Sequence, residues 1–426
     1  MRDKQSPELT PEGRERRNFT RKTSMLAGGM ALAGTSTLVH AAGEDRIRLA
    51  VVGCGGRGTG AMAQAMKADL GVELVAVADA FPDQAQRTAM IATKMFPAWR
   101  IKVTPETTFS GFDAYRKAID LADVVILATP PGFRPEHFAY AVAQGKHCFA
   151  EKPLATDAPG VRTVLEAARQ AKQKKLNVVV GLQRRYQRSY LEVEKRLRDS
   201  AVGEIISGQV YWNSPGVWVR KRKPGQTEME YQMRNWYYFN WLCGDHIVEQ
   251  HMHNIDVANW YIGEYPVSAQ GMGGRQVRTG KDHGQIFDHH FVEFVYPSGT
   301  VIASQCRHQP GCHDLVEERF QCTGGNIRTG GINAGELTTR NGKEIYSHGG
   351  LLDPSPYKTE HERLFEAIRN GQVISDGEHG ALSTLTAIMG RMATYSGQVI
   401  KWDEALASRR QLVPVSDTLD WAGAAP

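Results

Sequence analysis

The sequence predicts an α/β chain that begins with a doubly wound parallel sheet and continues into a second domain that also contains strands. Two observations support this expectation. In the first half of the chain, short apolar runs alternate with helix-compatible segments, which is typical of parallel strands joined by crossover helices. The chain has 426 residues, of which 41% are hydrophobic and 23% charged. It is therefore long enough for two domains, and its composition excludes a disordered or collagen-like protein.

Residues 1–43 have the composition of a removable export signal and carry most of the chain's formal net charge of +5. The pair Arg16-Arg17 precedes an apolar run over residues 24–39 and small residues ending at Ala41. This is the layout of a twin-arginine signal. A disordered arm or a membrane anchor are the alternatives, but the run is shorter than the roughly twenty residues of a spanning helix. We expect a periplasmic or secreted protein, exported by the twin-arginine translocation machinery, with no stable membrane anchor.

The remaining chain is expected to form two domains, over residues 44–180 and 181–426. Without the leader it is nearly neutral, which argues against a nucleic-acid-binding protein. Its six cysteines include no Cys-x-x-Cys pair, so a disulfide framework is not expected.

A glycine-rich turn follows the first apolar run of this body. The run at residues 47–52 leads into the sequence GCGGRG at 53–58, and a second run at 73–78 ends at Asp79. This is the G-x-G-x-x-G fingerprint between a strand and a helix. In that context the pyrophosphate of a dinucleotide lies on the helix N-terminus, and the acidic residue accepts from a ribose hydroxyl. An aspartate there repels a 2′-phosphate, so NAD is favoured over NADP.

Further apolar runs at 123–129, 147–150 and 177–181 continue the parallel sheet. Ligands of doubly wound sheets gather at the carboxyl ends of the strands. Polar residues follow the strands at these ends. A histidine lies in the helix that comes after the run at 123–129. The expected cofactor-binding residues are Gly53, Gly55, Gly56, Arg57, Gly58, Asp79, Thr129, Pro130, His137, Glu151 and Lys152.

These motifs resemble the Gfo/Idh/MocA family of NAD(P)-dependent sugar oxidoreductases. The resemblance rests on the glycine-rich turn, Asp79, the turn ATPP at 128–131 and above all the sequence EKP at 151–153. It extends through residues 181–186 and 244–256 to two closing helices near the C-terminus. It implies a Rossmann domain followed by an α+β domain with a large, open, mostly antiparallel sheet, through which members often form homo-oligomers. Strand-like runs that agree with this sheet lie at 204–212, 287–296, 300–307 and 314–323, and the closing helices at 357–370 and 378–396.

Residues 244–256 are the densest polar segment of the chain. Read as one helix, the segment has His246, Glu249, His253 and Asp256 on a single face. The resemblance implies that Glu249 and His253 occupy the family's acid and histidine positions beside the nicotinamide. Glutamate replaces the usual aspartate there, and His251 replaces a glycine.

The chemistry of hydride removal suits these groups. The hydroxyl proton must leave as the carbonyl forms, which requires a base such as a histidine oriented by a carboxylate. We predict that His253 is the acid/base and that Glu249 is its partner or a substrate ligand. Lys152, at a strand end, would stabilise the developing alkoxide. The alternative is that Glu249 and His253 form only a structural pair on a helix.

No metal site is expected, because H-E-x-x-H spacing is absent and His251 and His253 diverge on a helix. A looser group of cysteines and histidines at 306–322 matches no zinc module, and core packing between adjacent strands explains it better. It consists of Cys306, His308, Cys312, His313 and Cys322.

An aromatic and basic segment over residues 212–241 is interpreted as a loop that faces a sugar, since aromatic rings offer flat faces to sugar rings. A packed interface loop and a site for single-stranded nucleic acid are the alternatives. The expected substrate-binding residues are Arg184, Tyr186, Arg234, Trp236, Tyr237 and His251.

The resemblance implies an enzyme that oxidises a hydroxyl of a sugar or glycoside with tightly bound NAD. Outside the cytoplasm soluble NAD is scarce, so the cofactor would be regenerated within each catalytic cycle. Two alternatives stay open. One is an NAD-dependent glycoside hydrolase that works by transient oxidation, elimination, hydration and re-reduction, with His251 or Tyr237 as a second base. The other is a non-catalytic, cofactor-bearing binding protein.

Overall fold

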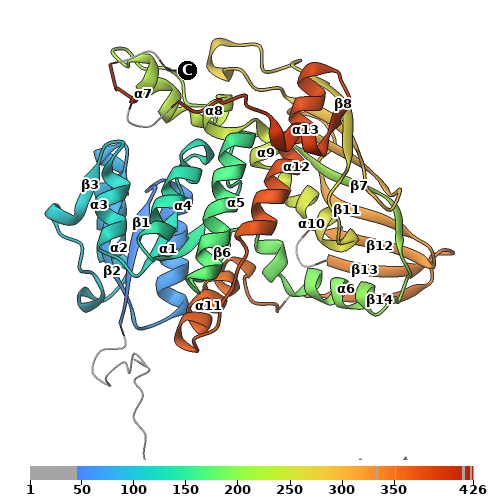
Figure 1. Cartoon of the computed structure of the whole chain (residues 1–426), viewed down its shortest axis with the longest axis horizontal. Helices are drawn as coiled ribbons and strands as arrows, with labels where there is room; N and C mark the ends of the chain where they lie inside the picture. The colour runs from blue at the N-terminus through green and yellow to red at the C-terminus, as the bar shows by residue number, and fades with distance from the viewer. Residues whose placement is uncertain (1–45, 332–333, 351, 415–417, 423–424, 426) are drawn as a thin grey trace, which may run out of the picture. The chain divides into compact units, whose positions relative to one another are not determined.

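The computed structural model of the chain describes residues 46–331, 334–350, 352–414, 418–422 and 425. The predicted export signal at 1–43 lies outside these residues. From Arg46 onward the chain forms one compact unit, in which two sheets are visible (Figure 1). No helix among the described residues has the length and apolar character needed to cross a membrane.

The first sheet is a six-stranded parallel sheet with strand order β3-β2-β1-β4-β5-β6. This is the doubly wound dinucleotide-binding order, with its switch point between β1 and β4, and it confirms the predicted fold class. Its strands are β1 (Ile47–Val52), β2 (Val72–Asp79), β3 (Thr108–Ser110), β4 (Val124–Leu127), β5 (His147–Ala150) and β6 (Val178–Val180). Its helices are α1 (Gly56–Ala68), α2 (Pro82–Met95), α3 (Ala114–Asp120), α4 (Arg134–Ala143) and α5 (Ala158–Gln173).

The second sheet has nine strands in the order β14-β13-β12-β11-β7-β10-β9-β8-β15. Every neighbouring pair for which a direction is assigned is antiparallel except β7 and β10, which run parallel. The expectation of a large, mostly antiparallel sheet is therefore confirmed. The strands are β7 (Ile205–Ser214), β8 (Ser268–Gly274), β9 (His289–Val295), β10 (Val301–His308), β11 (Leu315–Cys322), β12 (Gly325–Gly330), β13 (Ala334–Thr339), β14 (Glu344–Gly349) and β15 (Ile400–Lys401).

Helices cover one face of this sheet. The strands alternate buried and more exposed residues, as in β10, because successive side chains point to opposite faces. Helices α10 and α12 pack on the buried face, and α12 also contacts α5 of the first domain (Figure 1). The helices of this half are α6 (Arg188–Arg198), α7 (Glu228–Arg234), α8 (Asn240–Cys243), α9 (His246–Glu249), α10 (Met252–Ile262), α11 (Pro356–Arg369), α12 (Gly377–Ser396) and α13 (Trp402–Ala407).

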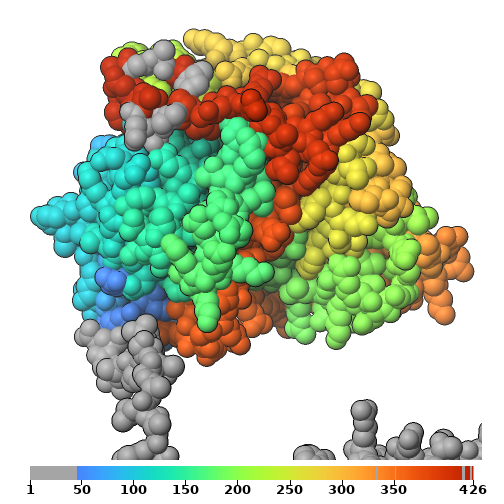
Figure 2. Space-filling view, in the orientation of Figure 1, coloured from blue at the N-terminus to red at the C-terminus, as the bar shows by residue number. Residues whose placement is uncertain are grey.

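The end of the chain returns to the first domain. Helix α11 packs on α1, and its Leu364 and Phe365 are buried in one core with residues of β1 and α1. After α13 the chain runs across α5 and the neighbouring elements, as the red segment in Figure 2 shows. There the Arg162 guanidinium donates to the carbonyls of Leu406 and Ser408. Segments from the end of the chain therefore pack on the first domain, although they are far from it in the sequence.

Candidate functional site

The glycine-rich turn between β1 and α1 is built around close backbone contacts. Gly53 has a φ of +95°, and a Cβ there would lie 2.4 Å from the Ala128 carbonyl carbon. A Cβ on Gly58 would lie 1.8 Å from the Gly53 oxygen, so only glycine fits either position. Gly55 and Gly56 differ, since a Cβ on either would meet no described heavy atom within 4 Å.

The open side of this turn fits the pyrophosphate of a dinucleotide. Gly55 is the N-cap of α1, and no side chain caps the helix. The first N–H groups of a helix have no partner inside it, and together with the helix dipole they form a site for an anion. The residues present therefore match the group that the motif predicts.

Asp79 ends β2 and ties it to the turn. Its Oδ2 accepts from the Cys54 N–H at 2.7 Å, and its Oδ1 accepts from the Phe81 N–H at 2.9 Å. Burial raises the pKa of this carboxyl, although these two hydrogen bonds oppose the rise. Each carboxylate oxygen keeps a further lone pair with which it can accept from a ribose hydroxyl.

Arg234, predicted to bind substrate, lies instead beside this strand end. Its two terminal nitrogens each donate to a carboxylate oxygen of Asp83 at 2.9 Å, and its guanidinium lies 3.7 Å above the Phe81 ring. The arginine that the sequence around Asp79 lacks is thus supplied by the second domain. Because it is paired with Asp83, its charge is already balanced.

The Arg57 side chain contacts two carboxylates. It donates to Glu151, which follows β5, and its Nη2 lies 3.1 Å from Oε1 of Glu360 on α11. Burial, together with the nearby charge of Glu151, raises the pKa of the Glu360 carboxyl well above its usual range. Arg57 therefore links the start of α1 to the end of β5 and to α11.

His137 lies below the end of β4. Its Nδ1 is 3.3 Å from the Thr129 hydroxyl, and its ring stacks on Tyr115 at 4.1 Å. Burial lowers the pKa of His137 to about 3, so the ring is neutral at physiological pH. Its position under the turn that begins at Pro130 fits support of the cofactor-binding edge.

Lys152 and Glu249 meet where the two domains join. The Lys152 ammonium donates to the Glu249 carbonyl at 2.5 Å and lies 3.2 Å from its Oε1. Both side chains are almost completely buried. This pair joins the end of β5 to α9, so the predicted catalytic lysine and acid do lie together.

The segment from Gly244 to Asp256 is not one helix, and the expectation of a single polar face is wrong. Helix α9 ends at Glu249, and α10 begins at Met252. Between them the His251 side chain turns towards β10, where its Nε2 lies 2.8 Å from the Ser304 hydroxyl. The Glu249 carboxylate therefore pairs with Lys152. The acid and base roles of these residues remain predictions.

His253 lies close to this pair, beside Trp212, whose ring centroid is 6.0 Å from its own. Burial lowers the pKa of His253 well below its usual range, and the positive charges of Lys152 and Arg184 lower it further. The neutral imidazole is the form that accepts a proton.

The other predicted substrate residues fall into two groups. Arg184 is buried against Glu318, to which it donates, and the Tyr186 hydroxyl donates to Asp376 at 2.5 Å. These two residues brace the second domain. Trp236 and Tyr237 instead belong to an aromatic cluster with Trp218, whose ring is 5.8 Å from Trp236 and 6.3 Å from Tyr237.

Tyr237 reaches from this aromatic cluster into the site. Its side chain is buried. Burial raises the pKa of Tyr237 well above its usual range, and the Glu249 carboxylate beside it raises it further. On its other side the ring lies 6.1 Å from the His308 ring.

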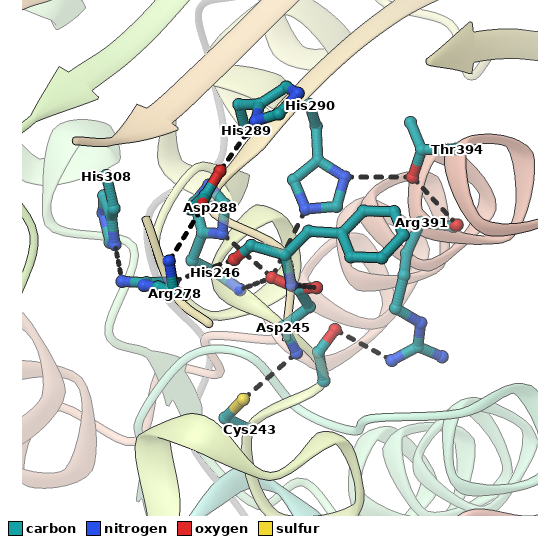
Figure 3. Close-up of polar contacts among 12 residues, drawn as sticks. Cys243, Asp245, His246, Arg278, Asp288, His289, His290, His308, Arg391 and Thr394 are labelled. Atoms are coloured by element: carbon teal, nitrogen blue, oxygen red, sulfur yellow. Dashed lines mark hydrogen bonds and ion pairs between the residues drawn. The ribbon is translucent and has the colours of Figure 1, made fainter. Parts of the chain in front are cut away.

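Asp245 is the centre of a second buried network (Figure 3). Its Oδ1 lies 2.9 Å from Nδ1 of His246 and 3.3 Å from Nε2 of His290. Its Oδ2 accepts from the Phe287 N–H and the Tyr395 hydroxyl. These contacts hold the pKa of Asp245 well below its usual range, although burial opposes them.

Three of these residues also have the geometry of a metal site. One ligand atom each from Asp245, His246 and His290 lies within 4.8 Å of the others. No metal site was predicted from the sequence, and two features favour the hydrogen-bonded network over a cation. The four contacts of Asp245 already satisfy its carboxylate, and the guanidinium of Arg278 lies against the neighbouring His308.

The most informative feature of the site is a set of polar atoms that are buried without a hydrogen-bond partner among the described residues. They include His246 Nε2, His253 Nδ1 and His308 Nε2. More than nine in ten buried polar groups in folded proteins are satisfied. Such exceptions near Lys152 and Tyr237 indicate a place for a polar ligand or for water.

His308 and His290 were missed by the sequence reasoning, which treated the group at 306–322 as core. Cys306 does pack in the core. His308 instead stacks on His246, with ring centroids 4.4 Å apart. The signal was available in β10, where Ser304 and His308 are polar at buried positions of the alternating pattern.

The order of the parallel strands, the glycine-rich turn and the acidic end of β2 define a protein that binds a dinucleotide. Comparison with known proteins gives the class: residues 47–181 match the GFO_IDH_MocA family, described as an oxidoreductase family with an NAD-binding Rossmann fold. The chain therefore carries an NAD-binding Rossmann domain of the Gfo/Idh/MocA oxidoreductase family.

Individual relatives cover more of the chain. The inositol 2-dehydrogenase of Rhizobium meliloti (strain 1021) is 26% identical over 352 residues, which is 80% of this chain and 94% of that protein. An inositol 2-dehydrogenase of Cereibacter sphaeroides is 28% identical over 256 residues, or 60% of this chain and 65% of that protein.

Two solved structures share the fold. The aldose-aldose oxidoreductase of Caulobacter crescentus, complexed with glycerol, superimposes with a TM-score of 0.65 at 18% identity, covering 84% of this chain and 99% of its own. Levoglucosan dehydrogenase, complexed with NADH and levoglucosan, gives 0.65 at 16% identity, covering 84% and 99%.

Proposed function

We propose that the protein is an NAD-dependent oxidoreductase that removes hydride from a ring hydroxyl of a sugar, glycoside or cyclic polyol. The observation that carries this proposal is that buried nitrogens of His246, His253 and His308 have no hydrogen-bond partner among the described residues, close to Lys152 and Tyr237. A polyhydroxylated ring both donates and accepts in many directions, so it satisfies such groups. The inositol 2-dehydrogenases among the relatives agree with this substrate class.

The residues of this site have complementary roles in the proposed reaction. Bound NAD would supply the hydride acceptor. Lys152 is a fixed cation that stabilises the negative charge on the substrate oxygen as its proton leaves. His253, held neutral by burial, accepts that proton. Glu249 positions the lysine through its carboxylate and its backbone carbonyl.

The cofactor is proposed to be tightly bound NAD. The turn at 53–58 and the N-terminus of α1 would hold its pyrophosphate, and Asp79 would bind a ribose. Asp79 repels a 2′-phosphate at the end of β2, and the charge of Arg234 beside it is balanced by Asp83, which supports NAD over NADP.

The aromatic cluster gives the substrate an apolar face. Trp218 is 41% exposed, Trp236 lies between it and Tyr237, and Tyr237 is buried beside Glu249. These contacting rings extend from the surface towards Glu249, and stacking on them suits one face of a sugar ring.

A second candidate function is an NAD-dependent glycoside hydrolase. Such a reaction needs a base besides the one that serves the oxidised hydroxyl, and the buried Asp245–His246 pair is an additional imidazole oriented by a carboxylate. Cleavage of nitrophenyl glycosides by the NAD-loaded protein would support this candidate. Reduction of the bound cofactor by free sugars without cleavage would support the first. A binding protein without turnover would neither cleave the glycosides nor reduce its bound cofactor.

Two further proposals concern the setting of the enzyme. We propose that residues 1–43 direct export by the twin-arginine route, which a fusion of this segment to a reporter tests through the effect of Arg16→Lys and Arg17→Lys on export.

We also propose a homo-oligomer formed through the uncovered face of the nine-stranded sheet, which light scattering of the purified protein tests.

The central experiment uses the full chain loaded with NAD. D-glucose, myo-inositol and their methyl or nitrophenyl derivatives are added, and the near-ultraviolet absorbance of reduced nicotinamide is followed. His253→Asn should lower kcat by about 10²–10⁴-fold, the usual contribution of a general base, while NAD still binds. His313→Asn, at an exposed position, is the matched control. A protein that binds no dinucleotide would overturn the proposal.

A further inference from the structure

His246 and His308 form a stacked pair of buried imidazoles whose proton positions are set by their neighbours. Their ring centroids are 4.4 Å apart, and the ring planes differ by 28°. His246 follows Asp245 in α9, and His308 ends β10 beside Arg278 (Figure 3). Both side chains are almost completely buried.

The proton of His246 is on Nδ1. This atom lies 2.9 Å from Oδ1 of Asp245, and an ionised carboxylate only accepts hydrogen bonds. Burial lowers the pKa of His246 to about 4 even though the Asp245 carboxylate opposes the shift. The ring is therefore neutral at pH 7, and its Nε2 carries a lone pair.

His308 has the opposite arrangement. Its Nδ1 lies 2.7 Å from Nη2 of Arg278, and a guanidinium only donates. Nδ1 of His308 must therefore accept, which puts the proton of the neutral ring on Nε2. One histidine of the pair thus presents an acceptor at Nε2, and the other presents a donor.

The two Nε2 atoms cannot satisfy each other. An imidazole N–H lies in the plane of its ring, and hydrogen bonds weaken steeply below about 120°. In rings stacked within 28° of parallel, the N–H of His308 cannot aim at the lone pair of His246. Neither atom has a partner among the described residues, and leaving such a buried group unmet is unfavourable.

We propose that this pair binds a second hydroxyl of the substrate, which accepts from Nε2 of His308 and donates to Nε2 of His246. This inference rests on the proposed function, because it assigns a specificity subsite next to the proposed reaction centre. Tyr237 links the subsite to the reaction centre, since its ring lies beside His308 and its hydroxyl near Glu249. A hydroxyl is the smallest substrate group that both donates and accepts.

The first test measures where the protons are. Nitrogen NMR of the NAD-loaded protein with labelled histidine, assigned with His246→Asn and His308→Asn, should show protonated Nδ1 in His246 and protonated Nε2 in His308 at pH 7. Either histidine in the other tautomer, or doubly protonated, would overturn the inference whether or not the protein turns over sugars.

The second test compares D-glucose and myo-inositol with their monodeoxy analogues. Removing one particular hydroxyl should lower kcat/KM, or affinity measured by tryptophan fluorescence, by about tenfold or more, because it leaves both imidazoles unmet. The ratio of kcat/KM, or of affinity, between the parent compound and this deoxy analogue should fall to within about twofold in His246→Ala and in His308→Ala. In His313→Ala the ratio should stay as it is in the wild type. The same ratio in wild type and both variants would refute the subsite.

The two proposals fail in different ways. No hydride transfer to NAD with any sugar would defeat the proposed function. If hydride transfer occurs and no single deoxy position is linked to His246 and His308, only the subsite is lost.

Discussion

The buried ion pair between Lys152 and Glu249 makes a quantitative prediction about stability. The two side chains are 10% and 11% exposed, and Nζ lies 3.2 Å from Oε1. With an effective dielectric constant of about 20, their Coulombic attraction is about 5 kcal/mol. Desolvation of both charges offsets much of it, and contacting residues usually couple by about 0.5–3 kcal/mol.

We expect Lys152→Met to lower the free energy of unfolding by about 3 kcal/mol, because it leaves the Glu249 carboxylate buried without its cation. Glu249→Gln should cost less, since the amide oxygen and the backbone carbonyl still accept from the ammonium. The double variant should lose about 2 kcal/mol less than the sum of the two single losses.

Urea unfolding of the cofactor-free protein at pH 7, followed by circular dichroism, measures these free energies. The exposed pair Lys117 and Asp113, whose side chains are 56% and 64% exposed, is the matched control. Lys117→Met with Asp113→Asn should couple by less than about 0.5 kcal/mol. If the losses at Lys152 and Glu249 add to within about 0.5 kcal/mol, the two charges are not coupled and the reasoning is refuted.

Three further predictions concern the first domain and the residues of the second domain that pack against it. Gly58→Ala should abolish NAD binding in a calorimetric titration, because its Cβ would lie 1.8 Å from a backbone oxygen, whereas Gly60→Ala, which meets nothing within 4 Å, should bind normally. Burial lowers the pKa of His361 to about 3. Below about pH 6.5 the unfolded chain therefore binds a proton at His361, and the folded chain does not. This difference lowers the free energy of unfolding by up to about 4 kcal/mol as the pH falls from 6.5 towards 3. His361→Phe should reduce the loss of unfolding free energy between pH 7 and pH 4, and an unchanged loss would contradict the assigned cause. Arg234→Ala should weaken NAD binding several-fold, because it leaves the Asp83 carboxylate unpaired close to Asp79. It should change stability by less than about 1 kcal/mol, because the pair is partly exposed, and a much larger destabilisation would show that the pair mainly holds the domains together.

Apolar runs and glycine motifs predicted the strands and turns that depend on a short stretch of sequence. The apolar runs of the first half became parallel strands, and Gly53 and Gly58 lie where their lack of a side chain is required. The four predicted strands of the second domain are present as β7, β9, β10 and β11. Strands such as β8, whose sequence SAQGMGG has only Ala269 and Met272 as apolar residues, carry little hydrophobic pattern and were not predicted.

The candidate site was predicted less completely, because distant contacts decide it. The helical period of residues 244–256 is real, but Asp245 takes a φ of +76° and His251 turns to Ser304 on a strand. These tertiary contacts break the helix and assign Glu249 to Lys152. Arg278, which fixes the proton of His308, belongs to no motif, and only the folded sheet brings it there.

The return of α11 to the first domain has a consequence for the order of folding. Glu360 on this helix pairs with Arg57 across 303 residues of sequence, and Leu364 and Phe365 fill the core beneath β1. On a growing chain, the glycine-rich turn and its strand exist long before the residues that cover their core have been made. The dinucleotide domain therefore completes its packing only at the end of synthesis, and contacts of such long range fold slowly. Truncation just before α11 should leave a chain that is exposed to aggregation and cannot retain a nucleotide.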